Sequence, residues 1–190
     1  MPTQPSRFSA KPSENMGKLI VARSLRELSF GKLMEVYSES NLENGRDLWP
    51  DETEGRLLAL AEQEFYNYLQ QVFFRTPGAQ YLIWEADGCY VSALRLEPYR
   101  DGLLIEALET APQHRGKGYA AALMQAVLES AGSMKVYSHV GKKNAASLRV
   151  HEKCGFMRIS ESAVYADGSV DSRCCTLCFC KSSAQERVIK

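Results

Sequence analysis

Hydrophobic positions along the chain recur with helical spacing in four separate stretches. The longest covers residues 54–75 and ends at Pro77-Gly78, which predicts a long amphipathic helix. A shorter stretch follows a Ser24–Glu27 capping box and predicts a first helix onward to Ser40. A third starts after Gly118 and ends at Gly132, and a fourth runs between Asn144, a good N-cap, and Gly155.

Short extended stretches lie between these predicted helices. Residues 18–22 predict a first strand, and residues 80–85 and 89–96 flank Asp87-Gly88, which is typical of a hairpin. Residues 103–110 are almost continuously apolar, as expected of a central strand covered on both faces. Three further strands are predicted at residues 134–140, 157–165 and 173–180.

Composition indicates one globular domain. The chain has 190 residues, of which 45% are hydrophobic and 24% are charged, enough for a single sizeable core. We expect a loose amino-terminal arm at residues 1–17, one domain at 18–181 and a tail at 182–190. The arm has no apolar segment of the kind found in secretory signals, and no apolar run reaches membrane-spanning length, so we expect a cytoplasmic protein without a membrane partner.

Charge is balanced. Lys plus Arg and Asp plus Glu each number 23, so no overall field favours nucleic acid as a partner.

Of the six cysteines, Cys175 and Cys178 have the spacing of half a zinc site or a redox pair, but no second pair of ligands is nearby. We favour packing inside a terminal strand, with Cys174, Cys178 and Cys180 on one buried face, and we expect no metal site.

Residues 115–120 carry the clearest candidate chemistry. They connect the predicted central strand to a helix whose first backbone amides have no partner within the helix, and such a turn attracts phosphate. Gly116 and Gly118 have no Cβ and let a diphosphate approach the main chain. The dinucleotide fingerprint does not fit, because Ala121 stands where its third glycine belongs, and the P-loop pattern is absent.

Two motifs together resemble the GNAT superfamily of N-acetyltransferases. The first is R-x-x-G-x-A, formed by Arg115, Gly118 and Ala120, and the second is an asparagine followed by a small residue and E-K-x-G-F, over residues 144–156. The resemblance covers about residues 18–180. It implies an α/β (α+β layered) fold, with a mixed, mostly antiparallel central sheet, helices on both faces, and strands 4 and 5 splayed apart.

The resemblance also implies a cosubstrate and its contacts. Acetyl-CoA would be the acetyl donor, with the diphosphate on the glycine turn and the acetyl and pantetheine groups on the main chain of the central strand. The helix after Asn144 would approach the pantetheine arm. The residues assigned to coenzyme A on this basis are Leu108, Glu109, Thr110, Arg115, Gly116, Lys117, Gly118, Tyr119, Ala120, Asn144 and Ser147.

Two residues are candidates for the catalytic proton transfers. Strand alternation places Glu106 on the face of Leu104 and Leu108 and turns Glu109 the other way, so we assign Glu106 as the base; the alternative is a strand glutamate paired with an arginine. His151 stands where most relatives have a tyrosine that protonates the departing thiolate. It is either that acid or a packed helix residue, with water as the acid. Tyr137 is a second candidate donor.

The resulting functional prediction is acetyl transfer from acetyl-CoA to a primary amine of a small molecule, by direct attack in a ternary complex. Two alternatives stay open: a non-catalytic acyl-CoA-binding module, and a protein or peptide N-acetyltransferase. The acidic residues 43–54, predicted as a loop, are either part of the acceptor rim or simply solvated. Aromatic residues of the long helix are either core or acceptor pocket. Homodimers are common among relatives.

Overall fold

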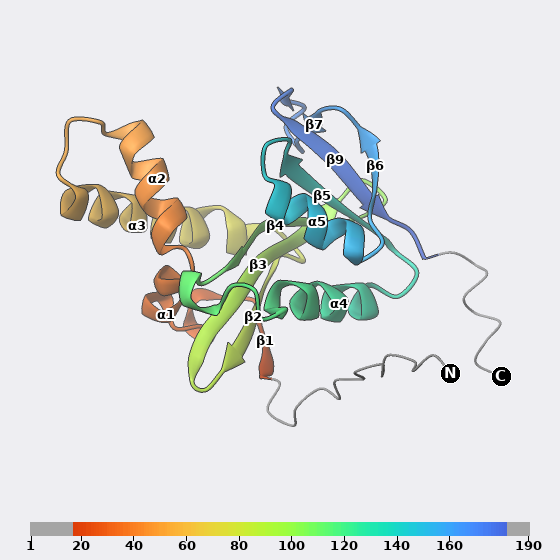
Figure 1. Cartoon of the computed structure of the whole chain (residues 1–190), viewed down its shortest axis with the longest axis horizontal. Coiled ribbons are helices and arrows are strands. Elements are labelled where there is room, and N and C mark those ends of the chain that lie inside the picture. Colours follow the sequence, from red (N-terminus) through yellow and green to blue (C-terminus); the bar gives the residue numbers. More distant parts are fainter. Residues whose placement is uncertain (1–16, 182–190) are drawn as a thin grey trace, which may run out of the picture.

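The computed structural model describes residues 17–181, so the predicted tail and all but the last residue of the predicted arm lie outside the described residues. Fourteen strands and α-helices follow one another along the chain (Figure 1): β1 (Lys18–Ala22), α1 (Phe30–Val36), α2 (Ser38–Leu48), α3 (Glu54–Gln71), β2 (Gln80–Ala86), β3 (Cys89–Tyr99), β4 (Gly102–Thr110), α4 (Tyr119–Ala131), β5 (Lys135–Gly141), α5 (Ala145–Lys153), β6 (Met157–Ser160), β7 (Ala163–Val164), β8 (Val170–Asp171) and β9 (Cys174–Phe179).

One mixed sheet forms the centre of the molecule. Its strand order is β1-β2-β3-β4-β5-β9-β6, and every neighbouring pair is antiparallel except β4 and β5. The parallel pairing of β4 with β5 stops at Ile105 and Ser138, although β4 continues to Thr110 and β5 to Gly141. The fold class and the splay between strands 4 and 5 are therefore confirmed.

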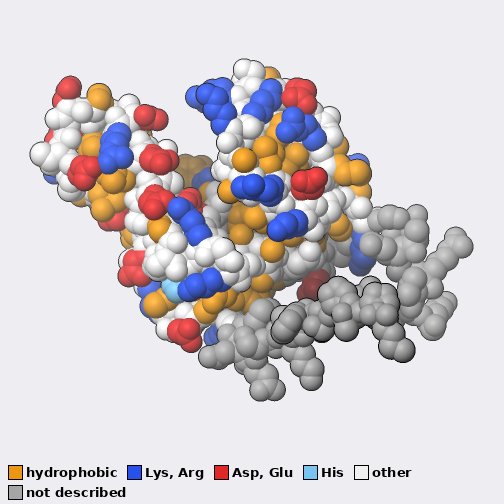
Figure 2. All heavy atoms as spheres, viewed as in Figure 1, with side chains coloured by type: hydrophobic (Ala, Val, Ile, Leu, Met, Phe, Trp, Pro, Cys, Tyr) orange, Lys and Arg blue, Asp and Glu red, His pale blue; other side chains and the backbone are white. Residues whose placement is uncertain are grey.

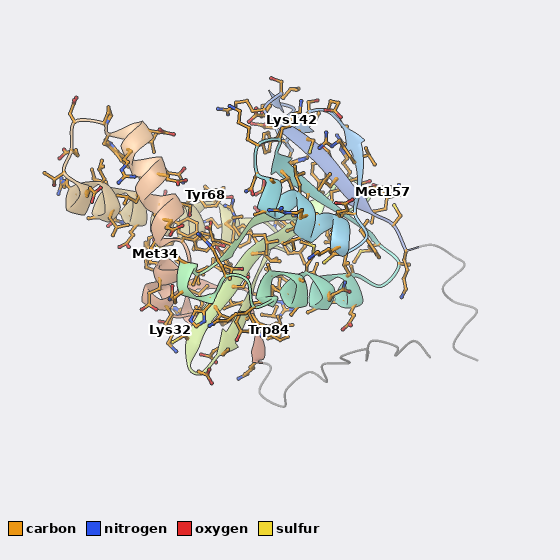
Figure 3. All side chains as sticks on the ribbon, in the orientation of Figure 1. Lys32, Met34, Tyr68, Trp84, Lys142 and Met157 are labelled. Carbon is orange, nitrogen blue, oxygen red and sulfur yellow. The ribbon has the colours of Figure 1, made fainter. Side chains whose placement is uncertain are left out.

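Helices cover both faces of this sheet, as predicted (Figure 1). On one face α4 buries Leu123 and Val127 against Ile105 of β4, with Leu148 of α5 at the margin of the same cluster. On the other face α1 and α3 bury an aromatic and aliphatic cluster, which includes Leu33, Leu69, Phe73 and Tyr81. Most aromatics of the long helix thus pack in or against the core, and Figure 3 shows Tyr68 where α3 meets the sheet.

A β-bulge interrupts β4 just beyond the splay. Arg95 of β3 pairs with Glu106 and Ala93 pairs with Glu109, so Ala107 and Leu108 together oppose Leu94. Ala107 has a φ of +49°, unusual for a residue with a side chain. Cross-strand partners share a face, and Ala93 and Arg95 lie on the same face of β3. The prediction that Glu109 points away from Glu106 is therefore wrong.

The bulge also moves Leu108. Leu104 packs with Tyr99, Tyr137 and Cys178 in a small cluster, whereas Leu108 packs against the α4 side of the sheet, beside Ile105. Simple alternation would have kept Leu104, Glu106 and Leu108 together. The extra residue of the bulge moves Leu108 to the opposite face. The prediction that Glu106 shares a face with both leucines is therefore correct for Leu104 and wrong for Leu108.

The acidic segment after the first helix is more ordered than predicted. The chain bends at Tyr37 and continues as α2, so residues 43–48 are helical, and the loop before α3 starts only at Trp49. Among the helices within residues 17–181, none combines the length and hydropathy needed to cross a membrane.

Candidate active site

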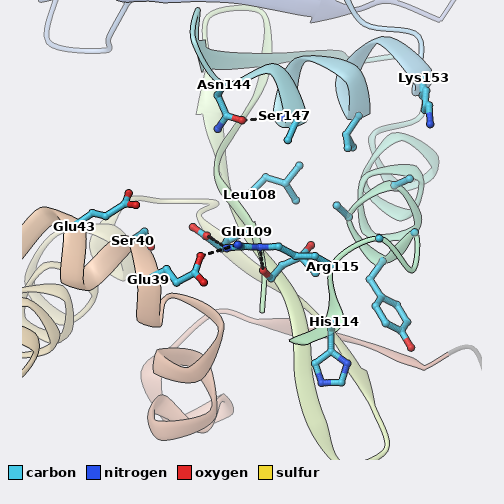
Figure 4. Close-up of a pocket in the computed structure, with 18 residues that line it drawn as sticks. Glu39, Ser40, Glu43, Leu108, Glu109, His114, Arg115, Asn144, Ser147 and Lys153 are labelled. Atoms are coloured by element: carbon cyan, nitrogen blue, oxygen red, sulfur yellow. Dashed lines mark hydrogen bonds and ion pairs between the residues drawn. The ribbon is translucent and has the colours of Figure 1, made fainter. Parts of the chain in front are cut away.

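A cavity of about 610 Å³ opens at the splay. Its walls are α2, the last residues of β4, the turn into α4, and one side of α5 from its N-cap to Lys153 (Figure 4). Figure 2 shows the surface hollowed between the lobe of α2 and α3 and the lobe of α5 and β9, with acidic side chains gathered on the α2 side. Every residue assigned to coenzyme A lines this cavity except Lys117.

The turn into α4 has the geometry that anion binding requires. Gly116 and Gly118 have φ angles of +76° and +86°, and apart from each glycine and its chain neighbours no atom of the described residues lies within 4 Å of where their Cβ atoms would stand. Gly118 is the N-cap of α4, a helix of 13 residues, and its carbonyl accepts from Ala122 N. The amides of the first turn are left available, and the helix dipole places positive charge there.

Arg115 connects two walls of the cavity. Its guanidinium lies 2.6 Å from Glu39 Oε2 on α2 and 3.3 Å from Glu109 Oε1 on β4, and its Nε donates to the carbonyl of Thr110 at 3.2 Å (Figure 4). A diphosphate on the adjacent turn would compete with both carboxylates for this guanidinium, because phosphate and carboxylate accept the same donors.

The sequence indicated only part of the acidic wall of the cavity: Glu43 belongs to the acidic segment that was one candidate for the acceptor rim, whereas Glu39 and Ser40 were not predicted. Glu39, Ser40 and Glu43 of α2 line it together with Glu109, and burial raises the pKa of Glu109 although the charge of Arg115 opposes this. Glu109 was predicted to contribute mainly main-chain atoms. Its side chain enters the cavity because of the bulge. Nothing in the sequence around Ala107 indicates that a bulge forms there.

Glu106 lies outside this cavity, on the sheet face that α3 covers. Its carboxylate is 3.4 Å from the Arg95 guanidinium, and both side chains are largely buried, at 18% and 16% exposure. Arg95 in turn lies 4.8 Å above the ring of Tyr68. Glu97, two residues along β3 from Arg95, has a pKa raised by burial and then by the charge of Glu106. The arginine pair left open by the sequence is therefore present, and the role of Glu106 as base stays a prediction.

His151 is 1% exposed and does not line the cavity. Its Nδ1 donates to the carbonyl of Ser147 at 2.8 Å, because a carbonyl only accepts, and its Nε2 lies 2.9 Å from Ser138 Oγ. The Ser147 hydroxyl, which belongs to a cavity residue, is 3.4 Å from Nδ1. His151 would reach a thiolate in the cavity only through Ser147.

Two histidines make folding sensitive to acid. Burial lowers the pKa of His151 and of His139, so the neutral form of each ring is favoured in the folded chain. The unfolded chain titrates near about 6.5 and binds more protons below that value, so the free energy of unfolding falls as the pH drops from about 6.5. We expect His151→Phe to flatten this dependence in urea titrations between about pH 7 and pH 5. An equally steep slope in the variant would contradict the assignment to His151.

Asn144 caps α5, as predicted. Its Oδ1 accepts from Ser147 N at 3.0 Å. We expect Asn144→Ala to lower the free energy of unfolding by about 1 kcal/mol, since the cap is lost, while Asn144→Asp retains an acceptor and most of the stability. Thermal unfolding of the two variants measures this difference. Equal losses would mean that the cap contributes nothing.

The other candidates are placed less favourably for chemistry. The hydroxyl of Tyr137 donates to Asp101 at 2.5 Å, near the start of β4, and this bond raises the pKa of Tyr137 to about 12.

Cys175 and Cys178 face opposite sides of β9, Cys175 in the α4-side cluster and Cys178 with Tyr137. The predicted burial is correct for Cys178 and wrong for Cys180, which is exposed. Within residues 17–181 no three His, Cys, Asp or Glu side chains converge on one point.

Comparison with known proteins agrees with this geometry. The sequence model of the Acetyltransferase (GNAT) family matches residues 33–156. No curated protein matches the chain by sequence.

Solved structures share the fold at low identity. The PaiA N-acetyltransferase from Thermoplasma acidophilum, in complex with coenzyme A, is 12% identical, with a TM-score of 0.59, over 86% of this chain and 99% of that chain. The N-acetyltransferase from Staphylococcus aureus Mu50 is 15% identical, with a TM-score of 0.53, over 86% and 98%. The spermidine N-acetyltransferase from Vibrio cholerae, in complex with CoA and spermine, is 18% identical, with a TM-score of 0.52, over 86% and 95%.

Proposed function

Because the chain belongs to the GNAT family of acetyltransferases, we propose that it moves the acetyl group of acetyl-CoA to a primary amine of a small molecule, by direct attack in a ternary complex. One observation carries the proposal. The glycine turn before α4, the end of β4 and one side of α5 meet around a single cavity at the splay of β4 and β5.

Coenzyme A would occupy this cavity in three parts. The diphosphate fits the first amides of α4, with Arg115 and Lys117 adding positive charge and Gly116, Gly118, Tyr119 and Ala120 forming the turn. The pantetheine arm runs between Asn144 and Ser147 on α5 and residues 108–110 on β4. The main-chain amides of that strand end are the donors for the thioester oxygen, which becomes negative as the amine attacks.

Acetyl transfer then needs two proton movements. The amine gives up a proton as the C–N bond forms, and we propose that Glu106 accepts it, directly or through water. The C–S bond breaks, and the leaving thiolate takes a proton. We propose the imidazolium form of His151 as its source: the Ser147 hydroxyl passes its proton to the thiolate and takes one from Nδ1, which leaves a neutral ring. Because burial favours the neutral ring, water remains the alternative acid.

A small cationic amine suits the acidic wall. Glu39, Glu43 and Glu109 line the cavity on the side of α2, where their carboxylates favour a cation. The spermidine acetyltransferase from Vibrio cholerae was solved with spermine, a small polyamine. These two observations favour a small amine over a peptide.

An acceptor panel tests the proposal. Thiol release from acetyl-CoA is followed with spermidine, with 2-phenylethylamine and with a short peptide that has a free N-terminus. Turnover with either small amine supports the proposal. Turnover with the peptide alone identifies a peptide acetyltransferase. Thermal stabilisation by coenzyme A without turnover for any acceptor identifies a binding module.

A further inference from the structure

We infer that Tyr37 is a positioning residue for acetyl transfer, because its phenol holds the β4 bulge in the form that presents residues 108–110 to the cavity. The inference rests on the proposed function for its effect on rate. Its structural part, a tyrosine that stabilises an irregular strand, stands without it.

The bulge needs support from outside the sheet. Ala107 has a φ of +49°, which crowds its Cβ and is unfavourable for alanine. It also has no register partner on either side, because pairing with β5 stops at Ile105 and the register with β3 passes from Glu106 to Glu109. A backbone carbonyl without a ladder partner needs another donor.

Tyr37 supplies that donor. Its hydroxyl donates to the carbonyl of Ala107 at 2.7 Å, across 70 residues of sequence. The side chain is 4% exposed, and its ring packs edge-on against Phe65 at 5.3 Å and Tyr81 at 6.4 Å between centroids. Burial raises the pKa of Tyr37, so the hydroxyl stays protonated and remains a donor. Ring and hydroxyl are both fixed in place.

The position of Tyr37 connects the two sides of the cavity. It is the residue between α1 and α2, and its own carbonyl accepts from Ser40 Oγ at 3.2 Å. Ser40 lines the cavity from α2, and Leu108 and Glu109 line it from the other side of the bulge. Tyr37 thus contacts both the start of α2 and the end of β4, which face each other across the cavity.

Tyr37→Phe tests the inference by removing one oxygen atom. We expect kcat with the best acceptor of the panel to fall by about tenfold to a hundredfold, because the main-chain amides of residues 108–110 are no longer held in the orientation that the thioester oxygen needs. The KM for acetyl-CoA should change by less than about threefold, since the glycine turn is unaffected. Amide hydrogen exchange in a peptide covering residues 105–110 should become faster, because the bulge opens more often.

Tyr90→Phe is the matched control. Tyr90 is buried in the same cluster at 5% exposure, and its hydroxyl accepts from Ser29 N at 3.1 Å, so this variant also loses one bond between a phenol and the main chain. It should leave kcat and the exchange of residues 105–110 unchanged.

Ala107→Gly in the Tyr37→Phe background tests the route of the effect. Glycine adopts a positive φ without the crowding of a Cβ, so the second change should restore kcat by about threefold or more. An unchanged kcat and unchanged exchange in Tyr37→Phe would overturn the inference, and so would a failure of Ala107→Gly to restore kcat. If wild type acetylates no amine, the proposed function fails, and hydrogen exchange alone decides the structural part.

Discussion

Replacing Gly118 by alanine is expected to weaken coenzyme A binding by about a hundredfold, a loss of about 2.7 kcal/mol in binding free energy. Gly118 lines the cavity and begins α4 with a φ of +86°. A methyl group there would enter empty space beside the amides that the diphosphate approaches, and the turn would lose its shape. Isothermal titration with coenzyme A measures the effect.

Gly132→Ala is its control. Gly132 ends the same helix with a φ of +62°, and a Cβ there also meets no atom within 4 Å among the described residues. Both substitutions should destabilise the fold by about 1 kcal/mol or more, because both force alanine to a positive φ. Only Gly118→Ala should lose coenzyme A. Equal affinities in the two variants would argue against a diphosphate at this turn.

Glu106→Gln is expected to lower kcat by about a hundredfold or more, the usual contribution of a general base. Coenzyme A affinity should be unchanged, because Glu106 does not line the cavity. The variant also leaves Arg95 without its charged partner, which costs about 1 to 3 kcal/mol of folding free energy. Steady-state kinetics and urea unfolding separate the two effects.

The control for Glu106 removes a comparable ion pair elsewhere in the sheet. Glu85 on β2 lies 3.3 Å from Lys32 and is 25% exposed, so Glu85→Gln should cost stability and leave kcat intact. If Glu106→Gln keeps full activity, the base is another group. Glu109 is then the next to replace, since the bulge turns its carboxylate into the cavity.

Local signals predicted the parts of the site that depend on local backbone chemistry. Gly116 and Gly118 adopt the positive φ angles for which glycine is suited, and Asn144 caps α5 as its side chain allows. These features need only a few neighbouring residues. They could therefore be predicted from sequence, together with the order of strands and helices around them.

The bulge and α2 depend on distant contacts and could not be predicted in this way. Ala107 is an ordinary strand residue by propensity, and its conformation is supported by Tyr37, 70 positions earlier. In α2 the only buried residues are Asn41 and Gly45, so the helix lacks an apolar stripe. Gly45 permits close packing on α3, where a Cβ would lie 3.1 Å from the Leu57 carbonyl oxygen. Packing against α3 therefore stabilises α2, a helix that the hydrophobic periodicity of the sequence did not indicate.

The short parallel seam between β4 and β5 divides the sheet into two antiparallel groups. Strands β1 to β4 form an antiparallel meander, and β5, β9 and β6 form a second antiparallel group. Only residues 102–105 and 135–138 pair across the seam. The core on the α4 side continues across the seam and joins the two groups, with Ile105 of β4 and Val136 of β5 in the same cluster. A ligand held between the end of β4 and α5 touches both groups where the strands have separated, so its binding energy stabilises the folded chain at the place where the sheet itself has no ladder bonds.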